Sequence, residues 1–257
     1  MRRAFVFLLI LGIVPACVRG QSDLPIEKVI EGAYLRDSTT RAEVGAMTMR
    51  AESYSRKLDG DGRVEQEKEF IKEYYFKDSL FKEEYLEYYL DGQRQSDKEL
   101  QKQIKEAEER RKKGRNRDAS IRPLEPFYPE NREHYSFSMP GVEMQHGCVT
   151  YHVVAECREK DENMLEGDYW FEVNYLNLVH TEFHPSKMPS KIKQLDMTMS
   201  FAPVEHGFWL PVGFHLIGRG KVFFLIKFNF EVEEKYSQYK VFVDLSDDFF
   251  TEVSDER

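Results

Sequence analysis

Apolar and polar residues alternate one by one along much of the second half of the chain. The apolar positions of residues 194–201 are Leu195, Met197, Met199 and Phe201. A period of two predicts β-strands with one dry and one wet face. The same alternation of large apolar residues continues in 208–216 and 222–232, so two further strands are predicted there.

The first half of the chain predicts a helix followed by three strands. Residues 24–35 carry Ile26, Val29, Ile30 and Ala33 at helical spacing. Residues 47–90 then read as strands, with a tight hairpin turn at Asp59–Gly62 and a second turn at Asp91-Gly92. A calcium loop at the first turn is excluded, because Arg63, Val64 and Phe70 stand where such a loop needs a ligand, a glycine and an acid.

A charged helix is predicted for residues 96–113. Ser96 and Glu99 have the spacing of a capping box, and lysine and arginine gather near the C-terminal end. Its apolar stripe is narrow: Leu100, Ile104 and Ala107. We therefore expect a surface helix with one docked edge and a solvated charged face. A proline-bearing connector, 121–135, leads from this helix to the second block of strands.

The first twenty residues predict a secretory signal peptide. Arg2 and Arg3 precede an apolar run, 4–14, that is too short to span a bilayer as an ordinary helix. Two processing alternatives stay open: cleavage after Gly20, or a lipobox-like segment that would leave an acylated Cys17. The expected domain is 21–243, followed by an acidic, flexible tail, 244–257.

The charge of the chain argues against nucleic acid as a partner. Loss of the leader with its three arginines would change the formal net charge from −9 to −12. Such a surface repels phosphate backbones.

The two cysteines that follow the leader are expected to be separate thiols. Cys148 and Cys157 are nine positions apart on one predicted strand, roughly 30 Å from each other and on opposite faces. That separation exceeds the reach of a disulfide. We interpret both as small buried apolar side chains.

The segment 178–185 resembles a zinc peptidase helix, but its spacing is wrong. Glu182 comes two residues after His180, whereas a zincin has its glutamate directly after the first histidine. The surrounding aromatic and β-branched residues predict a strand, on which His180 and His184 would stand roughly 13 Å apart. No metal site is therefore predicted. No nucleophile elbow, CxxC pair or phosphate-binding glycine loop is present either, so we expect neither an enzyme nor a cofactor.

Three short motifs carry a resemblance to a known group of proteins. They are G-x-x-W at Gly167–Trp170, G-x-W-L-P at Gly207–Pro211 and Y-S-x-Y at Tyr236–Tyr239. With the order of elements, they resemble exported bacterial proteins of the outer-membrane lipoprotein-sorting (LolA/LolB-like) group. The resemblance implies a mainly β (α+β) fold: a curved antiparallel sheet forms an incomplete, half-open barrel, with an N-terminal helix and the inserted helix 96–113.

The resemblance also implies a lipid-binding, carrier-like function in the periplasm or at the outer membrane. The ligand would be an acyl chain or the lipid of a lipoprotein, and the protein could associate with the membrane peripherally or through a lipid anchor. Alternating residues that would line the hydrophobic site are Leu195, Met197, Met199, Phe201, Leu210, Phe214, Phe224, Ile226 and Phe228. The alternative is an envelope scaffold or sensor with a filled core that binds a protein partner.

Overall fold

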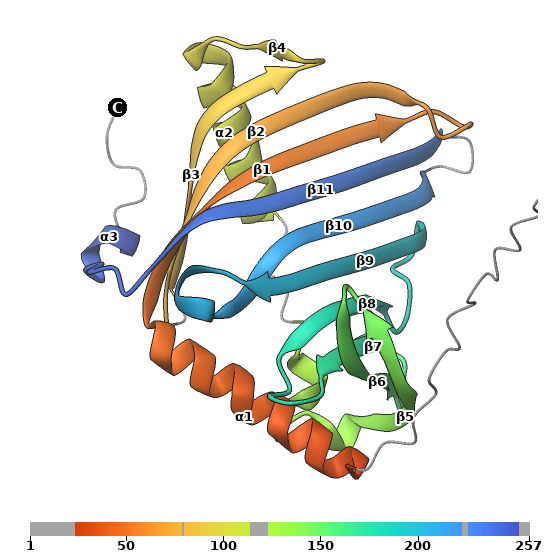
Figure 1. Ribbon diagram of the computed structural model, residues 1–257. Coiled ribbons are helices and arrows are strands. Elements are labelled where there is room, and N and C mark those ends of the chain that lie inside the picture. Colours follow the sequence, from red (N-terminus) through yellow and green to blue (C-terminus); the bar gives the residue numbers. More distant parts are fainter. Residues whose placement is uncertain (1–23, 79, 114–122, 223–225, 252–257) are drawn as a thin grey trace, which may run out of the picture.

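A single antiparallel sheet organises the protein. The computed structural model describes residues 24–78, 80–113, 123–222 and 226–251 (Figure 1). Its eleven strands follow the order β4-β3-β2-β1-β11-β10-β9-β8-β7-β6-β5, so β4 and β5 are the edges and the sheet is not closed into a barrel. The predicted fold class, mainly β (α+β) with a curved antiparallel sheet, is confirmed.

The helices and strands follow one another along the chain in the predicted order. The strands are β1 (Ala46–Leu58), β2 (Val64–Lys77), β3 (Leu80–Leu90), β4 (Gln93–Arg94), β5 (Tyr135–Gln145), β6 (Cys148–Cys157), β7 (Leu165–Glu172), β8 (Leu178–Pro185), β9 (Ile192–Pro203), β10 (Trp209–Val222) and β11 (Ile226–Val241). The α-helices are α1 (Ile26–Val44), α2 (Asp97–Lys113) and α3 (Asp248–Thr251), and the 3-10 segments are η1 (Glu125–Phe127), η2 (Arg132–His134) and η3 (Glu205–Gly207).

The predicted hairpin between β1 and β2 is confirmed. The Asp59 carboxylate accepts the backbone N–H groups of Asp61 (2.8 Å) and Arg63 (2.9 Å). An aspartate that bonds the backbone two residues ahead stabilises a turn locally. Its side chain is therefore engaged in the turn.

Helix α1 is longer than the predicted 24–35. Its buried stripe begins at Val29 and Ile30 and continues through Thr40 to Val44. Gly45 then ends the helix with a positive φ of 62°. In Figure 1, α1 crosses the lower end of the sheet, from the start of β1 to the region of β5–β7.

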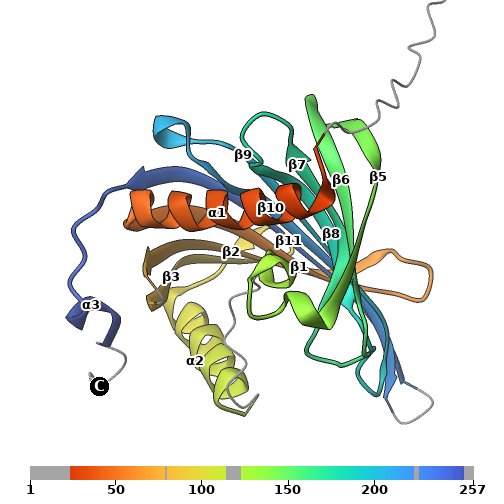
Figure 2. The same ribbon diagram turned by 90° about the horizontal axis from the view of Figure 1, so that it is seen from below.

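Helix α2 has nearly the predicted bounds and one docked edge. The Ser96 hydroxyl accepts the Glu99 N–H at 3.4 Å, which is half of the expected capping box. Leu100 and Gln103 are buried. Figure 2 shows α2 on the inner, concave side of the curved sheet.

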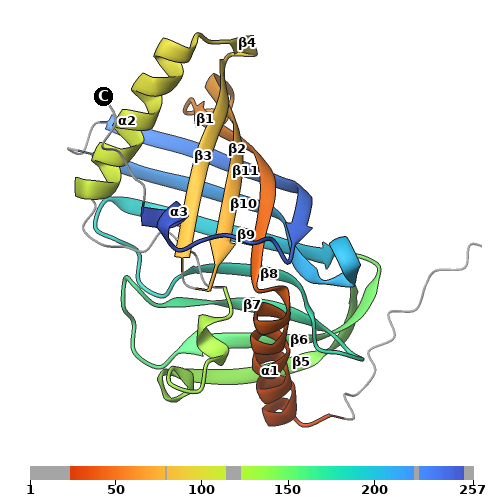
Figure 3. The same ribbon diagram turned by 90° about the vertical axis from the view of Figure 1, so that its left-hand side faces the viewer.

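Irregular pairing lets the sheet bend. The register shifts in the pairs β1/β11, β1/β2, β2/β3, β5/β6, β7/β8 and β9/β10, and each shift gives one strand of the pair an extra residue. Bulges of this kind increase local twist and curvature. Figure 3 shows the result, because β1–β3 run at a steep angle to β9–β11.

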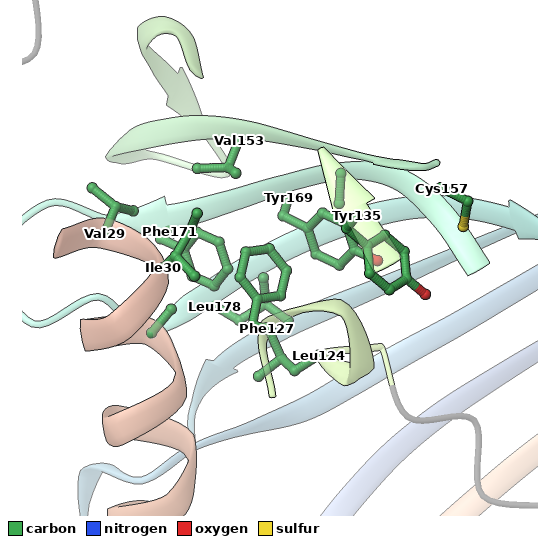
Figure 4. Close-up of a cluster of buried hydrophobic side chains, with 12 residues drawn as sticks. Val29, Ile30, Leu124, Phe127, Tyr135, Val153, Cys157, Tyr169, Phe171 and Leu178 are labelled. Atoms are coloured by element: carbon green, nitrogen blue, oxygen red, sulfur yellow. The ribbon is translucent and has the colours of Figure 1, made fainter. Parts of the chain in front are cut away.

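The main core lies at the β5–β8 end of the sheet. Figure 4 shows Phe127 from η1 in the middle of this cluster, between helix α1 and the strands. Its ring packs edge-on against Tyr169 and Phe171, with centroids 4.8 and 5.1 Å away. The buried members are Val29, Ile30, Ala33, Leu124, Phe127, Tyr135, Val153, Ala155, Cys157, Tyr169, Phe171 and Leu178.

The acidic C-terminal segment differs from the expected flexible tail. Phe249 packs against Tyr75 with ring centroids 4.8 Å apart, and Phe250 is buried. The Lys77 ammonium also donates to the Leu245 carbonyl at 2.6 Å. Aromatic residues therefore dock this segment as far as α3, whereas 252–257 lie outside the described residues.

The predicted signal peptide, 1–20, and Cys17 also lie outside the described residues. Within the described ranges, no helix combines the length and apolar character that crossing a membrane requires.

Candidate functional site

Cross-strand pairing arranges the concave face in rows. One row runs Phe183, Met197, Leu216, Val232, Ser55 and Lys68, from β8 to β2. The next row, which lies closer to the β1–β2 turn, contains Leu195, Gly218, Phe230, Lys57 and Gln66. The apolar side chains come from β8–β11 and the basic ones from β1 and β2. In these two rows, the concave face is therefore apolar on β8–β11 and basic on β1 and β2.

A buried apolar floor lies in the middle of this face. It consists of Phe183, Met197, Met199 and Phe214, which form one cluster. Phe201 packs against both this floor and the main core. The two methionines give the floor flexible, polarisable side chains that adapt to irregular contacts.

Beside the floor, apolar side chains remain half-buried on the same face. We call this set the open stripe: Leu195, Leu216, Phe228, Phe230 and Val232. Phe230 and Phe228 lie over Gly218 and Gly220, where an added Cβ would come within 2.2 Å of each ring. Glycine at both positions thus lets the rings lie flat along the sheet. The open stripe offers solvent-accessible apolar surface inside a curved face.

A polar cluster lies across from the floor, toward β3. The Lys72 ammonium is 3.2 Å from the Glu234 carboxylate and 3.8 Å from that of Glu83. Tyr74 and Tyr236 donate their hydroxyls to Glu234 at 3.1 and 2.8 Å. Burial opposes ionisation of Glu234, but Lys72, Tyr236 and Ser53 outweigh it and lower its pKa. Lys72 therefore has carboxylate partners within the protein.

A cavity of about 180 Å³ lies at the basic side, where Gln103 of α2 comes close to the sheet. Its lining residues are Ser55, Arg56, Lys57, Gln66, Lys68, Gln103 and Phe230. Phe230 belongs to both the cavity and the open stripe. The polar cavity and the apolar surface are therefore contiguous.

The structure separates the predicted lining residues into several places. Met197, Met199 and Phe214 are in the floor, Leu195 and Phe228 are in the open stripe, and Phe201 joins the floor to the core. Leu210 instead packs with Val44 and Val241 in another cluster. A register shift between Pro211 and Gly213 breaks the strict alternation that the sequence suggested. Phe224 and the side chain of Ile226 lie outside the described residues.

Some residues of the site were not predicted from sequence. Leu216, Phe230 and Val232 carry the same alternation as their neighbours, so that signal was available. Lys72 and Glu234 are far apart in sequence and meet only because β1 lies between β2 and β11. No local pattern indicates such a pairing.

The segment 178–185 is strand β8, as its composition predicted. The His180 ring bonds the Ser200 hydroxyl at 3.1 Å and lies 5.4 Å from the Trp170 ring, centroid to centroid. Burial lowers the pKa of His180, and the neighbouring His146 lowers it further. Across the described ranges, no three His, Cys, Asp or Glu side chains are grouped so that they could hold a metal ion.

Cys148 and Cys157 occupy the two ends of β6, and both thiols are free. Cys157 is buried and Cys148 is half-buried. The prediction of two separate thiols is confirmed.

Comparison with known proteins finds likeness in structure. No family model matches the chain, and no curated protein matches it. A domain assigned to outer membrane lipoprotein sorting from Vibrio parahaemolyticus is 14% identical, with a TM-score of 0.44 over 88% of this chain and 97% of that chain. A DUF1329 family protein from Desulfovibrio piger is 13% identical, with a TM-score of 0.43 over 88% and 97%.

A LolA superfamily protein from Nitrosomonas europaea is 11% identical, with a TM-score of 0.39 over 89% of this chain and 98% of that chain. A member of the group that the sequence motifs resemble is thus among the solved structures to which this chain is similar. All three TM-scores are below 0.5.

Proposed function

We propose that this protein is an exported binding protein that holds a hydrophobic ligand, such as an acyl chain, non-covalently on its concave face. The observation that carries the proposal is the open stripe, because its apolar side chains stay half-buried inside a curved sheet. Exposed apolar surface in a concave setting is typical of ligand sites. The role is binding, without catalysis.

Burial of an acyl chain can offset the cost of association. Burying one methylene yields about 0.8 kcal/mol, so twelve would give roughly 10 kcal/mol. That gain is of the size of the entropic cost of association, roughly 4–15 kcal/mol. The floor methionines, Met197 and Met199, would adapt to chains of different shape.

We place this protein in the periplasm or at the outer membrane. The support is the predicted leader and the lipobox-like alternative at Cys17. Either leader would export the chain, and acylation would anchor it peripherally. Among the lining residues predicted from sequence, we propose Leu195, Met197, Met199, Phe201, Phe214 and Phe228 as ligand contacts.

Calorimetric titration with monomyristoylglycerol, a neutral single-chain lipid, tests this function. Leu216→Asp places a charge in the open stripe and should abolish binding, while the protein stays folded because Leu216 is only half-buried. The matched control is Leu35→Asp, at an apolar position 53% exposed on α1. Equal binding by both variants would contradict the proposal.

A second candidate function is protein binding at the β5 edge. Met144 and Val149 pair across the end of the β5–β6 hairpin and are 62% and 47% exposed. Two exposed apolar side chains at a sheet edge favour contact with another chain. Met144→Ser with Val149→Ser should then release a co-purified protein without changing lipid binding.

A further inference from the structure

The cavity beside α2 differs in chemistry from the apolar surface that it adjoins. Its volume of about 180 Å³ far exceeds the roughly 10–15 Å³ that one water requires. The side chains of Ser55, Gln66, Lys68 and Gln103 give it hydrogen-bond donors. A cavity of this size and polarity accommodates a polar group larger than water.

Lys68 is the cation of this cavity whose charge is not neutralised. Its ammonium donates to the Gln103 side-chain oxygen at 2.9 Å, and an amide is neutral. In the part of the chain that the structure describes, no carboxylate lies within 4.0 Å of this ammonium. Lys72, on the same strand, has two carboxylates at that distance or closer.

The other two basic side chains of the lining are already paired. Lys57 pairs with Glu65 and is 68% exposed. The Arg56 guanidinium bonds Glu67 at 2.6 Å and Glu233 at 3.0 Å. The free positive charge is therefore centred on Lys68, and Gln103 keeps its amide N–H groups as additional donors.

The position of Lys68 connects this charge to the apolar site. It stands in the same row as Val232, with only Ser55 between them. Two strand spacings separate the two residues, roughly 10 Å. A ligand with its chain on Val232 and Leu216 would thus bring its head to Lys68.

We propose that the cavity binds the anionic head, a phosphate or a carboxylate, of an amphiphile whose acyl chain lies on the open stripe. The proposal rests on the function proposed above and names its ligand class. The half-buried ammonium strengthens its interaction with an anion because water screens it less. The neutral amide of Gln103 orients Lys68 without competing for its charge.

Calorimetric titration with three probes separates the possible ligands: myristoyl lysophosphatidate, monomyristoylglycerol and inorganic phosphate, with both lipids below their micellar concentrations. The wild-type protein should bind lysophosphatidate at least ten times more tightly than the neutral lipid. Lys68→Gln should reduce this preference to less than twofold and leave the affinity for monomyristoylglycerol unchanged. Lys68→Arg should restore most of it.

Lys105→Gln is the matched control, since it removes one charge from the exposed face of α2 and should keep the preference. Equal affinity for both lipids, unaltered by Lys68→Gln, would overturn the anionic-head assignment and leave the proposed function standing. Binding of inorganic phosphate as tightly as lysophosphatidate would show a free-anion site and would also overturn it. If neither lipid binds, the proposed function fails as well.

Discussion

The two halves of the concave face have similar sequence patterns, but their inward side chains differ in burial. The closed half, β5–β8, is covered by α1 and η1, and Phe127 fills its centre. The open half, β9–β11, keeps the half-buried residues of the open stripe. Alternation fixes which side chains point inward. Whether those side chains become core or accessible surface depends on the segments that cover them.

The two lysines of β2 extend this comparison to charge. Lys72 has Glu234 and Glu83 beside it, so its charge is balanced within the protein. Among the residues that the structure describes, Lys68 has only the neutral Gln103 as a side-chain partner. A balanced buried charge belongs to the structure, whereas an unbalanced one at a cavity favours an anionic ligand.

The largest effect is expected from truncating Phe127, which fills the centre of the closed half. Phe127→Ala should lower the free energy of unfolding by about 3–5 kcal/mol, because it leaves a cavity in a packed core. The control, Phe230→Ala in the open half, should cost about 1 kcal/mol, since that ring is half-buried. Urea denaturation measures both, and equal losses would erase the distinction between the halves.

Next in size is the loss of the balanced charge. Lys72→Met removes the cation that lies 3.2 Å from the Glu234 carboxylate and should cost about 3 kcal/mol. Lys68→Met removes no ion pair within the described residues and should stay within about 0.5 kcal/mol of wild type. The same denaturation assay checks both. A Lys68→Met loss as large as that of Lys72→Met would contradict the assignment of Lys68 to ligand binding.

A smaller effect is expected on the pH dependence of stability, to which the polar cluster around Glu234 contributes. The pKa of Glu234 lies below its ordinary value of 4.5, because Lys72, Tyr236 and Ser53 outweigh the opposing effect of burial. The stabilisation is present above pH 4.5 and is lost as pH falls through the lowered pKa. Below pH 4.5, the free energy of unfolding of the Glu234→Gln variant should fall less steeply with pH than that of the wild-type protein. An equally steep fall in both proteins would count against this account.

The smallest effect concerns the outer face of β8. Burial, and then the neighbouring His146, lower the pKa of His180 from 6.5. The stability of the folded protein therefore decreases as pH falls from 6.5 through the lowered pKa, because His180 takes up a proton in the unfolded chain before it does so in the folded protein. An NMR titration should give a midpoint below 6.5 for this ring. A midpoint at or above 6.5 would show that its environment is wetter than the contacts with Trp170 and Ser200 indicate.

Local patterns predicted most of the sheet. Alternation located β9 and part of β11, although Val222, the first residue of the predicted strand 222–232, belongs to β10. The aspartates and glycines of 59–62 located the first hairpin. Local patterns failed where tertiary contacts decide. Thr40 and Val44 extend α1 because they pack at its far end, and Phe249 and Phe250 dock a segment whose acidic composition suggested a free tail.

The site was partly predictable for the same reason. Met197 and Met199 lie on the predicted dry face, but the bulge beside Pro211 moves Leu210 into a different cluster. Neither the bulge nor the cavity beside α2 leaves a periodic signal in the sequence. The pairing of Lys68 with Gln103 depends on how α2 lies against the sheet.

Methyl NMR tests the central claim most directly, namely that the open half receives the ligand. In protein with labelled leucine, valine and isoleucine methyls, bound monomyristoylglycerol should give intermolecular NOEs from its chain to Leu216 and Val232. Val153 and Ile30, in the closed half, should give none. NOEs confined to the closed half, or none at Leu216 and Val232 with the lipid bound, would contradict the account.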